Sequence, residues 1–259
     1  MKEAIKVYLV GAGPGDPEML TVKAHRIIKN ADVVVYDRLV SEEIMQLIPA
    51  GSARISVGKQ PGCHPVPQDE INKLLVNMAR ADRCVVRLKG GDPFLFGRGG
   101  EEVAYLAENG ISCEVIPGIT TAAGCSASLG VPLTHRGLAS GVRYVTGHCR
   151  EDLPLDLDWA GLADPDTTLV IYMGRASMPE ISVRLIAEGL PASTPALAVI
   201  NCSRPDQRFV TSTLGEISTA VEANLKGPTL FLIGRVVELA DASNIKVESN
   251  VRELLQRTI

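Results

Sequence analysis

The sequence predicts an α/β protein of two domains, on three observations. Short apolar runs alternate with helical segments in the first half of the chain, which is the order that builds a parallel sheet flanked by helices. Glycine-rich segments follow several of these runs, as expected of turns at strand ends. The 259 residues are also enough for two domains of ordinary size.

The first half contains five expected strands, each a short run rich in apolar or β-branched residues. They cover residues 5–10, 33–36, 54–57, 84–88 and 113–116. Helices are expected at 21–30, capped by Thr21, at 67–81 and at 101–109. The helix at 67–81 places Ile71, Leu74, Leu75 and Met78 on one face. The segment of small residues after the last strand, 117–130, has helical character.

The second half of the sequence predicts a mixed sheet, because some of its expected strands lie close together in the sequence. Strands are expected at 142–146, 168–173, 196–200, 208–212 and 229–233, with helices at 179–188 and 214–223. The polar, glycine-containing segment 134–141 is the best junction between domains. We therefore expect an N-terminal α/β domain over 1–135, a C-terminal mixed domain over 136–242, and a fraying tail over 243–259.

The composition narrows the class of function. The net charge of −4 argues against a dedicated nucleic-acid binder, which needs excess Lys and Arg to neutralise phosphates. The six cysteines include no C-x-x-C pair, so neither a zinc site nor a disulfide framework is expected. No basic-then-apolar leader opens the chain, and no apolar run nears the roughly 20 residues of a membrane helix. We expect a cytoplasmic protein.

The first candidate site is the glycine cluster GAGPGDP at residues 11–17, directly after the first expected strand. Glycine there permits positive φ and close approach of the backbone to a ligand. A dinucleotide fingerprint is the competing interpretation, and Asp37 stands where its ribose-binding acid would. The fingerprint fails because Asp16 replaces its last glycine and Pro17 delays the next helix to about Thr21. A purely structural turn remains an alternative.

Two further loops have the same character. Five glycines fall between residues 90 and 100, a high cost in backbone entropy that makes sense if the backbone is a recognition surface. Asp92 in this loop can accept hydrogen bonds from a ribose or an amine. Arg98 and Glu101 lie one turn apart at the start of a helix, although Glu101 also suits the helix dipole. With the loop at 117–123, three strand ends converge on one crevice.

A series of motifs along nearly the whole chain resembles the tetrapyrrole methylases. They are VGAGPGDPEMLT, VVYDRLV, VGK, RLKGGDPFLFGRGGEE, VIPGITTAAG, PLTHR, YVTGH, YMG and GPTLFLIGRVV. The resemblance implies two α/β domains with S-adenosylmethionine in the cleft between them, a homodimer, and no metal. Its uroporphyrinogen-III-methylating branch is the most similar, which implies two successive methylations, at carbons 2 and 7, to precorrin-2. The product would feed sirohaem, cobalamin or haem d1 synthesis, and the sequence leaves these alternatives open.

The resemblance also implies the residues of the site. Cofactor contacts would fall on Pro14, Gly90, Gly91, Asp92, Leu95, Thr120, Thr121, Met173, Cys202, Pro228 and Thr229. Relatives often carry glycine where Cys202 stands, so a backbone contact is expected there. Catalytic roles would fall on Asp37, Lys59, Arg98, Glu101 and Arg136. The substrate cradle would comprise Arg38, Arg98, Arg136, His148, Arg150 and Met173, because guanidinium groups suit the many carboxylates of the macrocycle.

The chemistry needs no protein nucleophile, since a pyrrole carbon attacks the methyl group of the sulfonium directly. The protein must align the two within about 3–3.5 Å and remove a proton afterwards, with Glu101 or Asp37 as the base.

Competing functions are a sister methylase acting on later precorrins, diphthamide or ribosomal RNA, a nicotinamide-dependent oxidoreductase, and a non-catalytic tetrapyrrole carrier. Because the motifs begin within the first ten residues, no N-terminal dehydrogenase–ferrochelatase module is expected.

Overall fold

The computed structural model describes residues 7–58, 66–81, 83–148, 154–221 and 227–240. The chain forms two compact units, and both are α/β, as predicted. Unit 1 consists of Met1–Cys125, Val199–Arg208 and Leu225–Leu230, and unit 2 of Ser126–Ala198, Phe209–Asn224 and Phe231–Ile259. The predicted domain boundary at residue 135 remains a prediction, and the expected tail at 243–259 lies outside the described residues.

Unit 1 is built on a five-stranded sheet. Its strands are β1 (Val7–Gly11), β2 (Val33–Tyr36), β3 (Ala53–Ser56), β4 (Val85–Lys89) and β5 (Cys113–Ile116). They lie in the order β3-β2-β4-β1-β5, and each of these neighbouring pairs is parallel. Strand β4 is buried along its whole length, because a central parallel strand is covered on both faces. Its two charged residues, Arg87 and Lys89, are buried with the rest.

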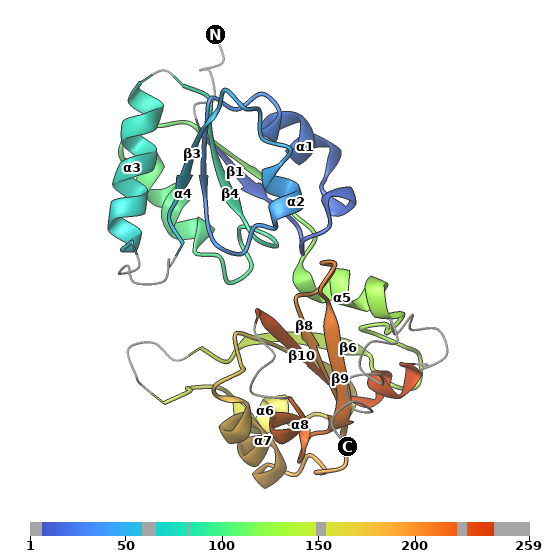
Figure 1. Ribbon diagram of the computed structural model, residues 1–259. Helices are drawn as coiled ribbons and strands as arrows, with labels where there is room; N and C mark the ends of the chain where they lie inside the picture. The colour runs from blue at the N-terminus through green and yellow to red at the C-terminus, as the bar shows by residue number, and fades with distance from the viewer. Residues whose placement is uncertain (1–6, 59–65, 82, 149–153, 222–226, 241–259) are drawn as a thin grey trace, which may run out of the picture. The chain divides into compact units, whose positions relative to one another are not determined.

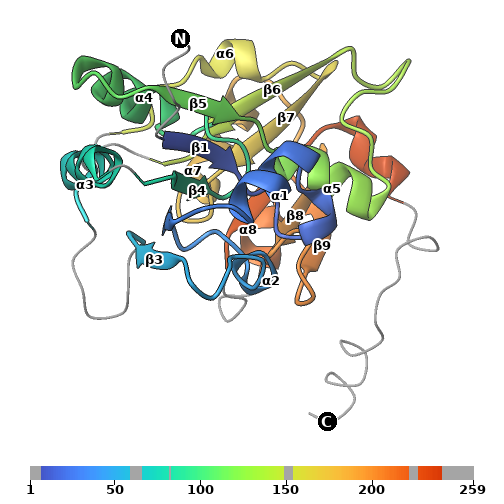
Figure 2. The ribbon, with the colours of Figure 1, turned by 90° about the horizontal axis from the view of Figure 1, so that it is seen from above.

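Helices cover the two faces of this sheet in pairs, as Figures 1 and 2 show. Helices α1 (Val22–Ile28) and α2 (Glu42–Met45) pack with Val10, Val34 and Leu88 on one face. Helices α3 (Gln68–Arg80) and α4 (Gly99–Glu108) pack with Val7, Val33 and Val85 on the other. The apolar face predicted for α3 meets the sheet, with Ile71 and Leu75 buried and Leu74 and Met78 partly buried.

The arrangement of these helices locates a ligand-binding edge. Strands β1 and β4 are neighbours, but β1 leads into α1 on one face and β4 into α4 on the other. Their two connections therefore diverge at the carboxyl edge of the sheet. In open α/β sheets, such a topological switch point opens the crevice in which ligands bind. Helix α5 (Thr121–Leu129) follows β5 at the same edge.

Most of a second five-stranded sheet belongs to unit 2. Its strands are β6 (Gly141–Thr146), β7 (Thr167–Tyr172), β8 (Pro195–Ile200), β9 (Arg208–Thr213) and β10 (Thr229–Ile233), in the order β6-β7-β10-β8-β9. Helices α6 (Trp159–Leu162), α7 (Met178–Ala187) and α8 (Ile217–Ala220) contribute to a core that includes Ile171 and Phe231. Strands β6 and β7 pair in parallel.

The differences from the predicted elements have local causes. The short helices α2 and α6 were not predicted, because four residues are too few to show a helical period. The 3₁₀ turns Pro17–Met19 and Arg235–Leu239 were not predicted either. The helix predicted at 214–223 is wrong at both ends: Gly215 is in a turn and Val221 is extended. Thr21 caps α1 as predicted, accepting from Ala24 N at 3.1 Å.

Candidate functional site

Three glycine-rich loops meet at the switch point through their backbones. We call residues 11–16, 89–98 and 117–121 the switch-point loops. Gly13 and Gly91 exchange two hydrogen bonds, N to O, at 3.1 and 2.8 Å. Ala12 N donates to the carbonyl oxygen of Lys89 at 2.7 Å. The convergence predicted for these loops is therefore a direct contact, made by the main chain itself.

Several glycines are needed for this packing. A Cβ atom at Gly118 would overlap the carbonyl oxygen of Gly91, and one at Gly11 would lie 2.5 Å from Gly118 N. Asp92 fastens the same loops, because its Oδ1 accepts from Phe94 N at 2.9 Å and its Oδ2 from Gly118 N at 3.1 Å. Gly91 is different: its φ is +68°, and a Cβ there would meet only Thr121 Oγ1, at 3.7 Å. Its outer side is open to a ligand.

The loop that follows β2 joins this assembly. Ser41 Oγ donates to the carbonyl oxygen of Gly15 at 2.5 Å. A Cβ at Gly90 would come within 2.6 Å of the Leu39 Cβ. Asp37, half-buried, accepts from Leu39 N at 2.9 Å, and Arg38 is exposed beside it. The two residues that the resemblance assigned to proton handling and substrate binding therefore border the switch-point loops.

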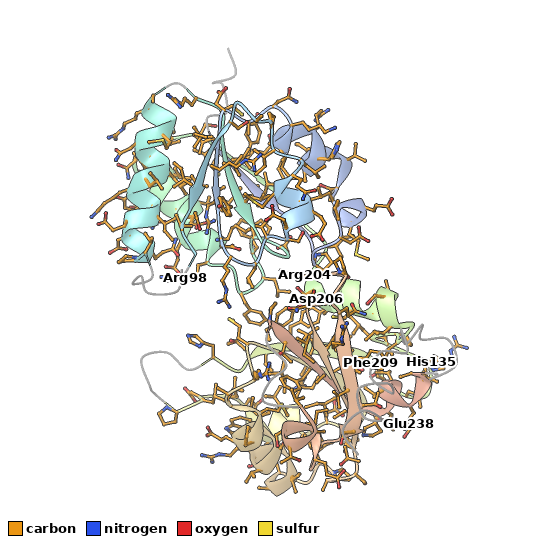
Figure 3. All side chains as sticks on the ribbon, in the orientation of Figure 1. Arg98, His135, Arg204, Asp206, Phe209 and Glu238 are labelled. Carbon is orange, nitrogen blue, oxygen red and sulfur yellow. The ribbon has the colours of Figure 1, made fainter. Side chains whose placement is uncertain are left out.

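The segment after β8 also belongs to unit 1. Asn201 N donates to Pro228 O at 3.0 Å, and the buried Cys202 thiol lies 3.7 Å from the carbonyl oxygen of Thr121. Arg204 donates to Leu39 O at 2.6 Å. Arg98 and Arg204 both lie at the lower edge of unit 1 in Figure 3. The structure thus brings the predicted positions Cys202, Thr121 and Pro228 into one neighbourhood.

Backbone strain coincides with the predicted site. Among the described residues, the non-glycine residues with positive φ are Phe96, Arg98, Met173, Asn201 and Ser203. Such conformations are uncommon outside glycine and cluster at functional sites. Four of them lie on the unit 1 loops described above, and Met173 directly follows β7 in unit 2. The sequence did not single out Phe96 or Ser203, because a single residue type carries little information on φ.

Arg98 and Glu101 form the ion pair that their spacing predicted. Arg98 donates to Glu101 at 2.8 Å through Nε and at 2.6 Å through Nη2. Their side chains are 56% and 55% exposed. The hydrogen bond to Glu101 raises the pKa of the Arg98 guanidinium. The pair is therefore a solvent-facing group.

The next residue, Glu102, belongs to a group that the sequence interpretation missed. We call Arg87, Lys89 and Glu102 the buried charge cluster. Glu102 is fully buried and accepts from Arg87 Nε at 3.0 Å and from Lys89 Nζ at 3.2 Å. Burial is the main cause that lowers the pKa of Lys89, and the charge of Arg87 adds to it. The available signal was two cations alternating in an apolar strand, VVRLK.

Other predicted residues lie elsewhere. Arg136 and His148 are exposed residues of unit 2, and Met173, half exposed, is in unit 2 as well. Lys59 and Arg150 lie outside the described residues. In the part of the chain that the structure describes, there is no group of three His, Cys, Asp or Glu that could hold a metal. Nor is any described helix both long and apolar enough to cross a membrane.

The residues present fit an adenosyl ligand. Gly91 leaves open space beside Thr121, as described above, and Thr120 lies next along the same loop. Large apolar side chains are exposed on the switch-point loops, with Phe94 at 60%, Phe96 at 38% and Ile119 at 38%, and Leu39 on the loop after β2 is exposed at 45%. Proteins expose such groups together mainly where a ligand or partner covers them. The site therefore combines open backbone, hydroxyl groups and apolar surface.

Comparison with known proteins points to one family. The sequence pattern of the tetrapyrrole (corrin/porphyrin) methylases matches residues 6–218. The uroporphyrinogen-III C-methyltransferase of Paracoccus denitrificans is 54% identical over 91% of this chain and 83% of its own. The siroheme synthase of Thiobacillus denitrificans is 51% identical over 91% of this chain and 49% of its own, so the chain spans about half of that protein.

A solved structure is also similar. The uroporphyrin-III C-methyl transferase of Thermus thermophilus, complexed with S-adenyl homocysteine, is 44% identical with a TM-score of 0.77. The match covers 90% of this chain and 99% of that one.

Proposed function

The chain belongs to the tetrapyrrole (corrin/porphyrin) methylases, and we propose that it transfers methyl groups from S-adenosylmethionine to carbon atoms of uroporphyrinogen III. Two transfers, at carbons 2 and 7, would give precorrin-2. One structural observation carries the proposal: main-chain hydrogen bonds join two of the switch-point loops beside the open side of Gly91, and the Asp92 carboxylate holds the third loop at Gly118. The relatives named above supply the reaction class and the substrate.

The cofactor would lie against unit 1 at the switch-point loops. Gly91 and the Thr121 hydroxyl offer close backbone approach and hydrogen bonding. Asp92 already holds two backbone N–H groups, so we assign it first to the shape of the loop. S-adenosylmethionine supplies an activated methyl group on a sulfonium. Further cofactor contacts are proposed at Pro14, Leu95, Met173, Cys202, Pro228 and Thr229.

The substrate would meet the exposed cations and apolar side chains of the same edge. Arg98 can bind a carboxylate with two parallel hydrogen bonds, the arrangement in which guanidinium recognition is strongest. Phe94 and Phe96 supply apolar surface for the macrocycle. Arg38, Arg136, His148 and Arg150 are proposed to bind further carboxylates.

The protein's own task is alignment and proton removal. Each methyl transfer from a sulfonium to carbon releases one proton, because the cation becomes a neutral thioether. Glu101 and Asp37 are the proposed acceptors, with Lys59 and Arg136 as further catalytic candidates. Arg98 would locate the ring while it pairs with Glu101. We further propose a cytoplasmic homodimer that binds neither membrane nor nucleic acid.

The central experiment is an anaerobic incubation of the purified protein with uroporphyrinogen III and methyl-labelled S-adenosylmethionine, followed by mass analysis. A doubly methylated tetrapyrrole is expected. Its absence would defeat the proposed reaction, and product from a later precorrin would favour a sister methylase. Calorimetry gives a second criterion, because S-adenosylhomocysteine should bind tightly and NAD should not.

A matched pair of variants tests the location of the cofactor. Gly118→Ala places a methyl group against the carbonyl oxygen of Gly91 and should abolish S-adenosylhomocysteine binding. Gly100→Ala is the control, since a Cβ there has open space and alanine suits a helix. Equal affinity for the ligand in both variants would place the cofactor elsewhere.

A further inference from the structure

A long-range hydrogen bond joins two segments of unit 1 that both border the candidate site. Arg204, on the segment after β8, donates from Nη2 to the carbonyl oxygen of Leu39 at 2.6 Å, although 165 positions separate them in the chain. The carboxylate of Asp206, labelled with Arg204 in Figure 3, accepts from Asn201 Nδ2 at 2.6 Å rather than from the guanidinium. The contact that fixes the Arg204 side chain is therefore its hydrogen bond to the main chain of Leu39.

A glycine in the first switch-point loop makes room for this arginine. A Cβ at Gly15 would lie 2.7 Å from Arg204 Cγ and 3.3 Å from its Nε. The Nε atom is buried and has no acceptor among the described residues. A buried donor without a partner lowers stability, and an apolar side chain beside Gly15 would avoid that cost. Arg204 therefore calls for a role beyond folding.

The segment that Arg204 holds carries Asp37. We call residues 37–41 the Asp37 loop. The N–H of Leu39 donates to Asp37 Oδ1 at 2.9 Å, while its carbonyl oxygen accepts from Arg204. A side-chain oxygen bonded to the N–H two residues on forms an Asx turn. Among the described residues nothing donates to Oδ2 of Asp37, so that oxygen is the one available to a ligand.

Other contacts of the Asp37 loop restrict its position but not the orientation of this turn. A Cβ at Gly90 would come within 2.6 Å of Leu39 Cβ, and Ser41 Oγ donates to the carbonyl oxygen of Gly15 at 2.5 Å. The first contact is packing, which has no directional preference, and the second lies beyond the turn. A hydrogen bond is directional, so the bond from Arg204 is the contact that orients the Leu39 carbonyl.

We propose that Arg204 is a positioning residue for methyl transfer, which holds the Leu39 main chain so that Asp37 keeps the orientation in which it accepts a proton. In that transfer the S–CH₃ bond breaks, the C–CH₃ bond forms, and the proton lost by the macrocycle passes to the carboxylate. The catalytic half of this inference rests on the proposed function. The coupling between Arg204 and the turn does not, because it follows from contacts within unit 1.

The first experiment measures the turn without any reaction. Protein labelled with ¹⁵N-leucine, with Leu39→Met to assign the signal, gives the hydrogen-exchange rate of the Leu39 amide. Arg204→Ala should raise this rate by about tenfold or more, because the hydrogen bond to Asp37 opens more often. Arg204→Lys can still donate to the carbonyl oxygen and should restore most of the protection. An unchanged rate in Arg204→Ala would overturn the proposal.

The chain offers a matched control in the same segment. Arg208 is exposed and donates only to the neighbouring carbonyl oxygen of Gln207, at 2.8 Å, so Arg208→Ala should leave the Leu39 rate unchanged. A further measurement needs no variant of Arg204. In the wild type, the Leu39 amide should exchange more slowly than an amide of an unstructured chain, and full exchange at that rate would overturn the proposed turn.

The second experiment separates positioning from cofactor binding. Arg204 is half-buried, so Arg204→Ala should fold. Its kcat for uroporphyrinogen III should fall by about 10- to 100-fold, as expected of a displaced catalytic group, while the KM for S-adenosylmethionine changes by less than about threefold. Arg204→Lys should recover most of the lost kcat. Loss of cofactor affinity with an unchanged kcat would overturn the proposal.

A double-mutant comparison tests whether Arg204 acts through Asp37. In an Asp37→Asn background, Arg204→Ala should cause no further loss of kcat, because the carboxylate that it positions is already absent. Losses that multiply, or full activity of Asp37→Asn alone, would overturn the proposal. If the Leu39 exchange rates change as expected and the wild type forms no methylated product, the proposed function fails while the coupling of Arg204 to the turn stands.

Discussion

Two neighbouring glutamates of α4 have opposite environments. Glu101 is 55% exposed and pairs with the equally exposed Arg98, whereas Glu102 is fully buried between Arg87 and Lys89. Successive helical residues point about 100° apart, so one glutamate faces the solvent edge and the other the sheet. The difference separates two tasks: the exposed pair can exchange partners with a ligand, and the buried cluster cannot without unfolding.

The largest expected effect is a loss of stability when the buried Glu102 is replaced. Glu102→Gln leaves two buried cations without their carboxylate, and breaking a buried ion pair costs about 3–5 kcal/mol. Urea denaturation would measure the loss in free energy of unfolding. Glu101→Gln is the control and should unfold with wild-type stability. Similar losses of unfolding free energy in Glu102→Gln and Glu101→Gln would contradict the different roles assigned to the two glutamates.

Replacing the exposed Glu101 should instead lower the rate of turnover. Glu101→Gln is expected to lower kcat for uroporphyrinogen III methylation by about 100-fold, the lower range for loss of a general base. Binding of S-adenosylhomocysteine, measured by calorimetry, should stay nearly intact. Wild-type turnover in this variant would remove Glu101 from the catalytic assignment and leave Asp37 as the candidate base.

The buried cluster should also show in the pH dependence of stability. The pKa of Lys89 is lowered in the folded protein, so between that pKa and the ordinary value of about 10.4 the unfolded chain binds more protons. Stability contributed by this group therefore rises with pH through that window. Below the pKa that Lys89 has in the folded protein, the full cost of burying its charge lowers the stability. The unfolding free energy of Lys89→Met, relative to wild type, should accordingly fall as pH rises toward 10.4; a constant difference would contradict the direction.

The smallest expected effect is the contribution of the exposed Arg98–Glu101 ion pair to the free energy of unfolding. A double-mutant cycle of Arg98→Ala and Glu101→Ala should give a coupling energy below about 1 kcal/mol, since exposed ion pairs are screened by water and salt. The coupling should decrease further at high salt. A value as large as that of a buried pair would mean that these residues support the fold rather than the ligand.

Much of unit 1 was predictable from local patterns. The strands at 33–36 and 113–116 have the predicted bounds, because a valine run or a run ending before Pro117 is a local signal. Thr21 caps its helix as expected. Asp16 and Pro17 delay the helix after the first loop, so the rejection of a dinucleotide site has a visible basis: Asp16 Oδ1 accepts from Glu18 N in a 3₁₀ turn.

The sequence determined the class of fold, the positions of the glycine loops and the family, since these depend on periodicity, turn residues and motifs. Only the tertiary structure decided that β4 lies between β1 and β2, and therefore that Arg87 pairs with Val35. It also decided which of Glu101 and Glu102 is buried. The physical reason is that burial depends on partners distant in the chain, such as Arg87 for Glu102, and the two adjacent glutamates carry no local signal that distinguishes them.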